Sequence, residues 1–364
     1  MRAQKVGNDI VFRAREERRH CLGFSPPQSL ERGTTQVACM ATEMPLVSIG
    51  LPVYNGENFV ADAIQCVLDQ TFSNWELIIC DNGSTDRTVT ICRDYANHDN
   101  RIRVYQNARN MGLAFNFNEV FRLSRGRYFK WITHDDLFTP EFLESCIHEL
   151  EKDERVVMVF PMICYADAAG RPQRRQGCEL SILGSTAESR VHKLMALEMQ
   201  STDIFWSLYG LIRRDVLKQT GLMGLYNGSD QVLLLEVALR GCLKQIGKEL
   251  FLRREHPLAA TSRRGWTFRE RAKFVNANDK RRLVFPYCRM LKEHLICILT
   301  GPMPFWARLR CTTVVLKRFL VQWKYFAEEA VWSPLQALRS SWRTVGRLPE
   351  SRPRPSITSS RDTK

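Results

Sequence analysis

The 364-residue sequence has no long hydrophobic run. A helix that spans a membrane needs roughly 18 apolar residues without charges, and the nearest stretch, residues 295–307, is shorter and carries two prolines. The first residues are rich in Arg and Glu and lack the apolar run of a signal peptide. These absences argue against export and against a transmembrane anchor, and they predict a cytoplasmic protein.

The twelve cysteines form no CxxC pair and show no metal-ligand spacing. Most of them lie inside apolar patterns, as Cys66, Cys80, Cys146 and Cys164 do. Free cysteine is among the residue types most often buried. The pattern therefore predicts reduced core residues, which is typical of a cytosolic protein.

Acidic residues are scarce in the last part of the chain. From Thr261 to the C-terminus there are 22 Lys and Arg against 7 Asp and Glu, whereas the preceding residues carry 31 against 32. A basic segment of this kind suits an anionic partner, either a membrane surface or nucleic acid, although a solvated tail without a partner is an alternative. Because the charge lies outside the organised domain and no nucleic-acid motif is present, we expect no specific nucleic-acid partner.

The chain divides into four segments by pattern. Residues 1–44 have weak periodicity and mixed charge, which predicts a disordered leader. Residues 45–262 form the organised domain, and residues 263–345 form a basic helical extension. Residues 346–364, rich in Pro, Arg and Ser, are expected to be a disordered tail.

Strand and helix patterns alternate at short spacing from residue 45 onward. Apolar strand patterns cover residues 46–54, 75–81, 101–107 and 128–133, and amphipathic helices follow each of them. Asn55-Gly56 predicts a turn after the first strand. Such alternation predicts an α/β fold with a mostly parallel, doubly wound sheet flanked by helices.

Two expected helix starts follow strands of this sheet. Ser84 or Thr85 is expected to cap the helix that begins near residue 87, and Thr139 is expected to cap the helix that Pro140 opens. Further along, a helix is expected over residues 229–240, ending at Gly241.

Carboxylates stand where three predicted features end or begin. Asp81 closes the second strand, and the adjacent Asp135 and Asp136 follow the fourth. Because parallel strands bring their carboxyl ends to one edge of the sheet, these acids are expected to line a cleft. Asp81 can accept hydrogen bonds from a base or a ribose, or cap a helix, and Tyr54 offers a stacking face.

The pair Asp135 and Asp136 suits Mg²⁺ or Mn²⁺, because these ions prefer oxygen ligands and complete their shells with water and substrate phosphates. The alternative is that the acids only favour a helix N-terminus. Asp230 stands at the start of a helix, where a carboxylate is well held for a general base. The alternative there is a simple N-cap.

Four motifs together resemble family 2 glycosyltransferases of the GT-A fold, inverting enzymes that use nucleotide-diphosphate sugars. They are VSIGLPVYNGENFVADAIQCVLDQTFSNWELIICDNGSTD, NARNMGLAFNFN, GRYFKWITHDDLFTPEFLE and GSDQVLLLEVALRG followed by LRREHP. The resemblance covers residues 45 to about 262. It implies a nucleotide-sugar-binding half over residues 45–136 and an acceptor and catalytic half over residues 137–262.

The resemblance assigns roles to single residues. It implies that Asp230 is the general base and that Asp135, with Asp136 beside it, is the metal-binding acid, while His256 approaches the metal or the diphosphate. The residues that it places around the nucleotide are Pro52, Tyr54, Asp81, Asn110, Gly112 and Asp135.

The sequence departs from the family pattern at several of these positions. Thr133 and His134 occupy the first two places of the usual DxD motif, which gives an HDD variant. Asn82 stands where a second acid is common, and Ser229 where an acid often precedes the base. These departures put metal dependence in doubt more than they do the fold.

The function implied is transfer of a sugar from a nucleotide-diphosphate sugar to a hydroxyl of a glycan or lipid-linked acceptor, in the synthesis of polysaccharide or glycoconjugate. The acceptor is expected near residues 160–226, where Trp206 and Tyr209 are either sugar-stacking or core residues. A catalytically inactive scaffold and a nucleotidyltransferase are the alternatives, although the loop after the first strand lacks a Gly-rich phosphate motif. The basic helices, with tryptophans at 266, 306, 323, 332 and 342, are expected to rest peripherally on the cytoplasmic face of an anionic membrane.

Overall fold

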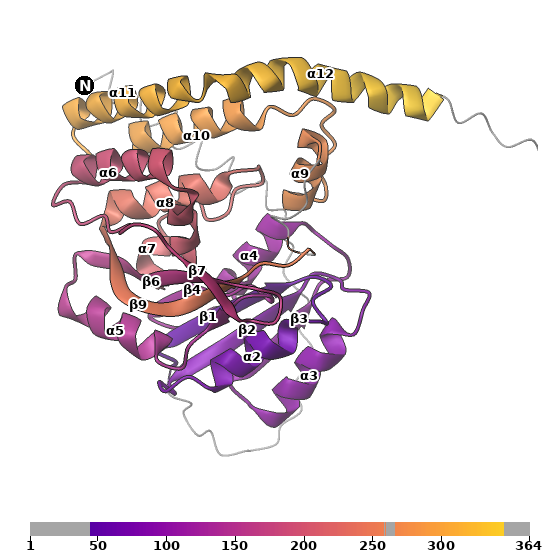
Figure 1. The fold of residues 1–364 in the computed structure, drawn as a ribbon, viewed down its shortest axis with the longest axis vertical. Coiled ribbons are helices and arrows are strands. Elements are labelled where there is room, and N and C mark those ends of the chain that lie inside the picture. The colour runs from indigo at the N-terminus through magenta and orange to yellow at the C-terminus, as the bar shows by residue number, and fades with distance from the viewer. Residues whose placement is uncertain (1–43, 258, 260–265, 346–364) are drawn as a thin grey trace, which may run out of the picture.

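The structure is a computed structural model, and it describes residues 44–257, 259 and 266–345. The expected tail and all but the last residue of the expected leader lie outside this range. In the described part, a mixed β-sheet is covered by helices on both faces, and further helices extend from one side (Figure 1). The α/β fold class expected from the sequence is confirmed.

One nine-stranded sheet organises the molecule, with strand order β3-β2-β1-β4-β8-β6-β9-β5 and β7 paired to β6. Its strands are β1 (Val47–Val53), β2 (Trp75–Asp81), β3 (Ile102–Gln106), β4 (Tyr128–Trp131), β5 (Leu137–Phe138), β6 (Val156–Ala166), β7 (Pro172–Arg175), β8 (Leu211–Arg213) and β9 (Cys242–Arg254).

The first four strands are parallel to one another, as the alternating pattern predicts. Beyond them the sheet is mixed. The short strand β8 runs antiparallel to both β4 and β6, and β5 runs antiparallel to β9, whereas β6 and β9 are parallel. The expected parallel arrangement therefore holds for β1 to β4, and the pairing is mixed after residue 131.

Helices cover both faces of the sheet (Figure 1). Those of the organised domain are α2 (Val60–Leu68), α3 (Thr88–His98), α4 (Leu113–Arg122), α5 (Phe142–Lys152), α6 (Ala187–Gln200), the 3₁₀ helix η1 (Thr202–Tyr209), α7 (Arg214–Leu217) and α8 (Ser229–Arg240). The C-terminal helices are α9 (Phe268–Val275), α10 (Pro286–Thr300), α11 (Phe305–Val321) and α12 (Trp323–Val345).

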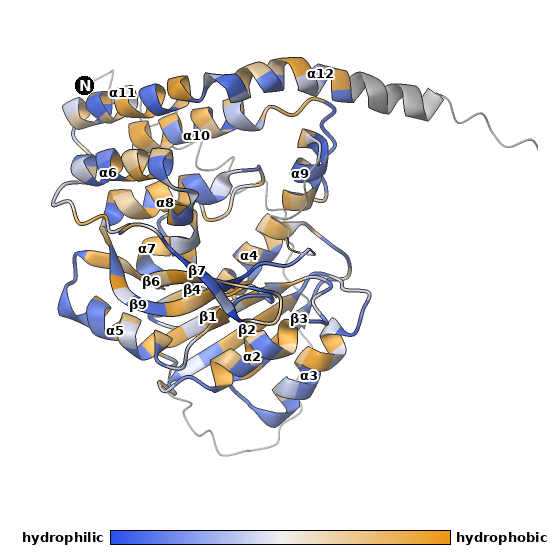
Figure 2. Cartoon of the chain, viewed as in Figure 1, coloured by the Kyte–Doolittle hydropathy of each residue, from blue (hydrophilic) through white to orange (hydrophobic). Residues whose placement is uncertain are grey.

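The mostly apolar sequences of β1, β2 and β4 are explained by burial of both faces of the sheet. Ile78 and Phe129 belong to one hydrophobic core, which faces α4, α6 and α8, while Leu77 and Tyr128 belong to the other, which faces α2 and α5. Successive residues of a strand point to opposite faces, so a strand buried on both sides is apolar at most positions. Figure 2 shows these hydrophobic strands between the two layers of helices.

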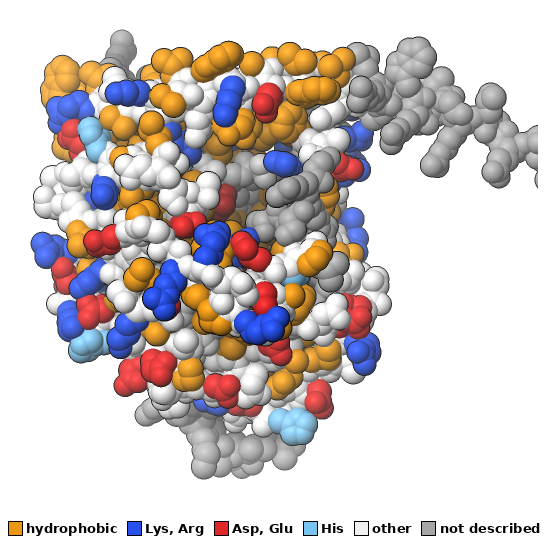
Figure 3. Space-filling model, in the orientation of Figure 1, with side chains coloured by type: hydrophobic (Ala, Val, Ile, Leu, Met, Phe, Trp, Pro, Cys, Tyr) orange, Lys and Arg blue, Asp and Glu red, His pale blue; other side chains and the backbone are white. Residues whose placement is uncertain are grey.

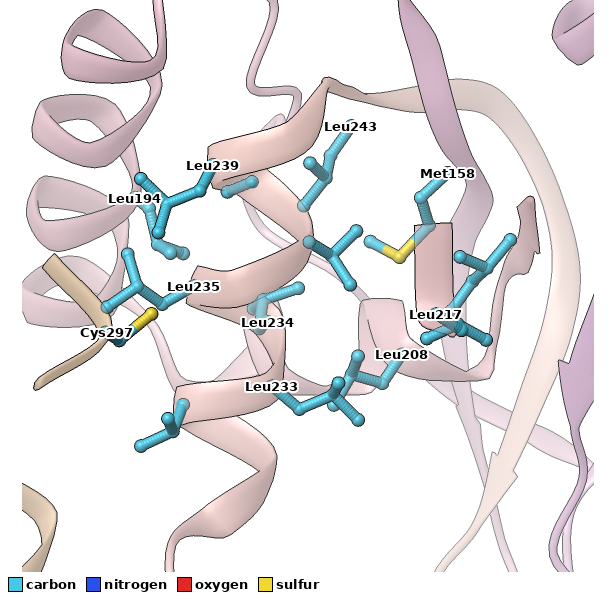
Figure 4. Packing of buried hydrophobic residues seen from close by; sticks show 14 of the residues in the cluster. Met158, Leu194, Leu208, Leu217, Leu233, Leu234, Leu235, Leu239, Leu243 and Cys297 are labelled. Atoms are coloured by element: carbon cyan, nitrogen blue, oxygen red, sulfur yellow. The ribbon is translucent and has the colours of Figure 1, made fainter. Parts of the chain in front are cut away.

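Helix α8 is the centre of the larger core. Its residues Leu233, Leu234 and Leu235 are all fully buried, and three consecutive buried positions mean that neighbours surround the helix. Figure 4 shows the leucines of α8 between α6, η1, β9 and α10. Helix α8 is therefore packed on all sides, which fixes the position of its first turn and of Asp230 in that turn.

Two of the expected helix caps are wrong. Helix α5 begins at Phe142 with Glu141 as N-cap, and the backbone N–H of Leu143 donates 3.0 Å to Oε1 of Gln70 rather than to Thr139. At α3 the acceptor for the N–H of Thr88 is Oδ1 of Asp86, at 3.0 Å. The cap of α5 comes from a residue some seventy positions earlier, which local sequence cannot reveal.

The expected basic extension is helical. Helix α11 packs against α6 and α10, α10 packs against α8, and α9 packs against α4. No helix among the described residues is long and apolar enough to cross a membrane. The domain boundaries near residues 45 and 262 stay predictions.

Candidate active site

The loops that follow β1 and β2 are bound to each other at the carboxyl edge of the sheet. Asn55, in a left-handed conformation with φ 51°, accepts a hydrogen bond from the backbone of Thr85 at 2.9 Å, and its own N–H donates to Oγ of Ser84 at 2.8 Å. The predicted Asn55-Gly56 turn is thus confirmed. The pairing brings Tyr54, which is 42% exposed, to the same edge as the end of β2.

Pro52, the other expected residue of this edge, is buried in β1 next to Cys80 of β2. The pairing of β1 with β4 ends earlier, at Gly50 and Trp131. Proline removes a backbone donor and is tolerated in a central strand only where a ladder bond is missing. Pro52 therefore lies just beyond the last pair of residues that joins β1 to β4.

Asp81 is fully buried at the end of β2, with one oxygen satisfied and one not. Its Oδ2 accepts hydrogen bonds from the backbone N–H groups of Gly83 and Ser84, at 3.2 and 3.0 Å, whereas Oδ1 is buried without a hydrogen-bond partner. Leaving a buried acceptor unsatisfied costs free energy. The arrangement provides a fixed acceptor for a donor group on a ligand.

A network of asparagines holds the loop before α4 against the strand ends. Oδ1 of Asn82 accepts from the backbone of Met111 at 3.0 Å, and Nδ2 of Asn82 donates to Oδ1 of Asn110 at 3.1 Å. Asn110 in turn accepts from the N–H of Gly112 at 2.8 Å. Asn82 therefore needs both a donor and an acceptor here, and an aspartate would lack the donor.

Gly112 is the N-cap of α4, with φ 97°, a conformation that favours glycine. A Cβ at this position would lie 2.6 Å from the carbonyl oxygen of Val275 in α9. The backbone of Ala277 also donates to the carbonyl of Met111, at 3.4 Å. The C-terminal extension thus packs directly against the loop that carries Asn110 and Gly112.

Asp135 and His256 meet although they are far apart in the sequence. Nε2 of His256 lies 3.1 Å from Oδ2 of Asp135, and the two side chains are 3% and 17% exposed. Burial on its own raises the pKa of Asp135, but the charge of His134 and the hydrogen bond to His256 outweigh it and hold that pKa below its usual value. Asp135 is therefore held as a carboxylate, the form that a metal ligand requires.

Asp136 has other hydrogen-bond partners than Asp135. Its Oδ2 accepts from Oγ1 of Thr133 at 2.6 Å, and its Oδ1 accepts from the backbone N–H of Arg254 at 3.0 Å. Burial, followed by the charge of Asp135, raises the pKa of Asp136 to about 7. Thr133, which replaces the first acid of the usual motif, thus holds Asp136 in place, and the structure does not bring Asp136 together with His256.

Asp230 lies in the first turn of α8 and is half-buried. The N-cap is Gly228, so the simple N-cap interpretation of Asp230 is wrong. Burial raises the pKa of Asp230, and its own backbone N–H and that of Gln231 offset part of the shift. A carboxylate with a raised pKa is a better proton acceptor, which suits a general base.

Tyr209 connects the two groups of acids. Burial raises the pKa of its hydroxyl, and the charges of Asp136, Asp230 and Asp135 raise it further. The charges of all three carboxylates therefore act on one side chain, that of Tyr209.

The ring of Tyr209 is part of an aromatic stack. It packs on Trp206 at 5.9 Å and on Phe251 at 6.0 Å between ring centroids, and the guanidinium of Arg253 lies 4.1 Å from the Trp206 ring. These contacts favour the core interpretation of Trp206 and Tyr209 over sugar stacking.

A divalent cation fits this site only with help from a substrate. Among the residues that the structure describes, no three His, Cys, Asp or Glu side chains gather as a metal-binding group. Asp135 and His256 supply two converging candidates, one oxygen and one nitrogen. Mg²⁺ commonly binds through one or two carboxylates together with substrate phosphates and water, so two protein groups are sufficient.

The sequence did not reveal the salt bridge that anchors the end of β9. Nη2 of Arg254 lies 2.9 Å from Oδ2 of Asp62 in α2, and the Arg254 side chain is 4% exposed. This ion pair fixes the strand two residues before His256. The motif LRREHP did indicate that Arg254 has an ion-pair partner, because a charged residue inside a buried strand needs one.

The parallel strands of the first half, with the acids at their carboxyl edge and a mixed sheet beyond, define a GT-A glycosyltransferase fold. The crystal structure of S. aureus TarS 1-349 in complex with UDP-GlcNAc superposes with a TM-score of 0.56 at 15% identity, over 76% of this chain and 72% of that chain. At this identity the likeness establishes the fold alone.

Sequence comparisons find similarity to one family over part of the chain. Residues 48–221 match Glycosyl transferase family 2. An uncharacterized glycosyltransferase of Rickettsia typhi is 40% identical over 120 residues, which is 33% of this chain and 36% of that protein, and the chondroitin synthase of Escherichia coli is 37% identical over 118 residues, or 32% and 17%. The matched part is about a third or less of these relatives' length. Over residues 48–221 the chain is thus similar to family 2 glycosyltransferases.

Proposed function

We propose that the protein is an inverting glycosyltransferase that moves a sugar from a nucleotide-diphosphate sugar to a hydroxyl of a glycan or lipid-linked acceptor. Three observations support the proposal: the unpartnered Oδ1 of Asp81 at the end of β2, the contact of Asp135 with His256, and the position of Asp230 in the first turn of α8. Each of these groups suits a different part of such a reaction.

The donor end of the cleft is assigned to Tyr54, Asp81 and the loop of Asn110 and Gly112. Oδ1 of Asp81 is a buried acceptor that can pair with an N–H of a base or a hydroxyl of a ribose, and the exposed ring of Tyr54 can stack on the base. The complex of S. aureus TarS with UDP-GlcNAc agrees with a donor of this class.

The diphosphate end is assigned to Asp135 and His256. These two residues would hold a Mg²⁺ or Mn²⁺ ion, with Asp136 behind them keeping the turn in place through Thr133 and Arg254. When bound, such an ion supplies electrostatic stabilisation of the charge that grows on the departing diphosphate.

Asp230 is assigned as the general base. Held on the first turn of α8, it accepts the proton of the acceptor hydroxyl while that oxygen attacks the anomeric carbon from the face opposite the diphosphate. The bond from the anomeric carbon to the diphosphate breaks as the new glycosidic bond forms, so the configuration inverts without a covalent enzyme intermediate. The names of relatives such as chondroitin synthase support polysaccharide synthesis as the setting.

The test is isothermal titration of the purified chain with UDP, dTDP and GDP, each with Mn²⁺ and with EDTA. We expect one nucleotide to bind, and to bind more tightly with Mn²⁺. An Asp81→Asn variant replaces the unpartnered acceptor by an amide and should weaken that binding, whereas Asp94→Asn on the exposed face of α3 should not. If none of the three nucleotides bound, the donor site would be refuted and the inactive-scaffold alternative would be favoured.

A further inference from the structure

Helix α11 has two apolar faces, and the residues that the structure describes cover only one of them. Ala307, Cys311, Val315 and Phe319 are buried against the domain. On the other side Phe305, Leu309, Leu316 and Leu320 are exposed, at separations of 4, 7 and 4 residues, which keep them on one side of a helix. A helix that is apolar on two sides normally has partners on both.

The exposed stripe continues along α12. Trp323, Val331 and Leu335 are exposed there, and α11 and α12 run nearly end to end across one end of the molecule (Figure 1). Figure 3 shows the hydrophobic side chains as a row along this edge. The exposures are large, at 72% for Leu320 and 65% for Trp323. A contiguous apolar surface of this kind marks an interaction site rather than ordinary surface.

An apolar groove adjoins the stripe between α10 and α12. It has a volume of about 350 Å³, and of its seven lining side chains Lys292 alone is charged. Leu291, Leu295 and Leu299 of α10 form one wall, and Phe326 of α12 forms the other. The groove widens the apolar face from a single line of side chains to a surface shared by neighbouring helices.

The charges around this surface are mostly basic, although Glu328 of α12 is exposed. Helix α11 contains no Asp or Glu, and Lys317 and Lys324 are exposed beside Leu316, Leu320 and Trp323. Between Thr267 and Gln336 the chain has 13 Lys and Arg against 5 Asp and Glu, and three of these acids, Asp279, Glu293 and Glu329, are buried. Apolar side chains next to lysines suit a helix that lies in the interface of an anionic bilayer.

A second copy of the chain is a poorer partner for the same surface. In a twofold dimer the same patch faces itself, so Lys317 and Lys324 would approach their own symmetry mates. A membrane with anionic headgroups instead attracts the lysines while its acyl region receives the leucines and the tryptophans. The charge pattern therefore selects the bilayer over self-association.

We propose that the outer faces of α11 and α12, with the groove between α10 and α12, dock the protein on the surface of an anionic lipid bilayer. The apolar stripe enters the boundary between headgroups and acyl chains, and the lysines contact the headgroups. The proposal does not depend on the glycosyl-transfer chemistry, because none of the stripe residues belongs to the cleft.

The test is sedimentation of the full chain with extruded vesicles of phosphatidylcholine alone and of phosphatidylcholine with phosphatidylglycerol, at low and at moderate salt. We expect binding to the anionic vesicles that weakens as salt rises. A Leu316→Glu/Leu320→Glu variant should bind at least about tenfold more weakly, and so should Lys317→Glu/Lys324→Glu, whose changes are confined to charged positions. Tyr105→Glu, an exposed site on the edge strand β3, should bind as the wild type does.

Fluorescence supplies a second readout that is specific to the face. With brominated lipids, quenching should be lost in part in Trp306→Phe and Trp323→Phe, because both rings are exposed on this surface. The proposal is overturned if the wild type binds neither vesicle type at low salt. It is also overturned if Leu316→Glu/Leu320→Glu converts a dimer to a monomer in light scattering while vesicle binding is unchanged.

Discussion

Nε2 of His256, just beyond β9, lies 3.1 Å from Oδ2 of Asp135, in the turn after β4. The two side chains are brought together by the long strand β9, which also pairs with β5, Leu252 with Leu137, and is fixed at Arg254 by the salt bridge to Asp62. The contact between Asp135 and His256 thus depends on residues from both ends of the organised domain.

Removing either partner of this pair should weaken metal-dependent nucleotide binding. Asp135→Asn is expected to abolish the difference between titrations with Mn²⁺ and with EDTA. His256→Gln should reduce the affinity on the order of 10- to 100-fold, the usual effect of losing a group that orients a metal ligand. His98→Gln, at an exposed histidine of α3, is the matched control and should bind normally. Equal affinity of Asp135→Asn and wild type with Mn²⁺ would refute the assignment.

Asp230→Asn should nearly abolish sugar transfer and leave nucleotide binding intact. General-base catalysis is typically worth ~10² to 10⁴ in rate, and the amide keeps the shape of the carboxylate without its basicity. Because burial raises the pKa of Asp230, kcat/KM should fall with decreasing pH at values above the ordinary titration range of an aspartate. The pH profile of the wild type and the rate of the variant, with Asp94→Asn as control, check this prediction. Full activity of Asp230→Asn would mean that another group takes the proton.

A buried ion pair connects helix α11 of the C-terminal extension with helices α6 and α8. Nε of Arg318 in α11 lies 2.6 Å from Oε2 of Glu198 in α6, with side-chain exposures of 2% and 0%, and Nη2 of Arg318 donates to Oε1 of Gln231 at 2.9 Å. Gln231 follows Asp230 directly.

Arg318→Met should therefore lower the free energy of unfolding by about 3–5 kcal/mol, because it leaves a buried carboxylate without its partner. The double variant Glu198→Leu/Arg318→Met should recover most of this loss, since an apolar pair can replace a buried ion pair. Urea unfolding measures both, with the neighbouring exposed Lys317→Met as control. A loss below about 1 kcal/mol in the single variant would mean that the pair contributes like a surface salt bridge.

Glu149 should make the protein sensitive to acid. Side-chain hydrogen bonds from Lys152, at 2.7 Å, and from Lys244 lower the pKa of Glu149 to about 2. In the unfolded chain this pKa returns to about 4.5, so the unfolded state binds more protons between these values and stability decreases as pH falls from about 4.5 towards 2.

Glu149→Gln should remove about 1–2 kcal/mol of stability at pH 7, after allowance for solvent screening, and should flatten the stability profile in that acid window. Thermal unfolding between pH 7 and pH 3 measures this, with Glu154→Gln, an exposed neighbour, as control. Parallel profiles for Glu149→Gln and wild type would contradict the prediction.

The sequence predicts the first half of the fold closely, because its signals are local. The apolar runs of β1 and β2 and the turn at Asn55 follow from residue types that allow few other structures. It does not predict β8 or β5, which are too short for any periodicity and exist because β4, β6 and β9 offer them edges. The cap of α5 by Gln70 was missed for the same reason.

The site divides in the same way. The positions of Asp81 and Asp135 at strand ends follow from pattern, and so does Asp230 at the start of a helix. The different hydrogen-bond partners of Asp135 and Asp136 do not follow from the sequence pattern. Adjacent residues of a turn can point in several directions, and hydrogen bonds from Thr133 and Arg254 fix the position of Asp136. Asn82 looked like the loss of an acid, and its hydrogen bonds show a structural role instead.

The sheet order has a consequence for synthesis of the chain. One edge of β4 pairs with β1, but the other pairs with β8, through Tyr128 with Arg213 and Phe129 with Ile212. Strand β8 is made about eighty residues after β4, which at about 5–20 residues per second leaves that edge open for several seconds on the ribosome. An open strand edge is a template for wrong pairing. Nascent chains arrested before residue 211 should therefore be cut by protease near β4 and held by chaperones, and chains arrested well beyond β9 should resist the same treatment.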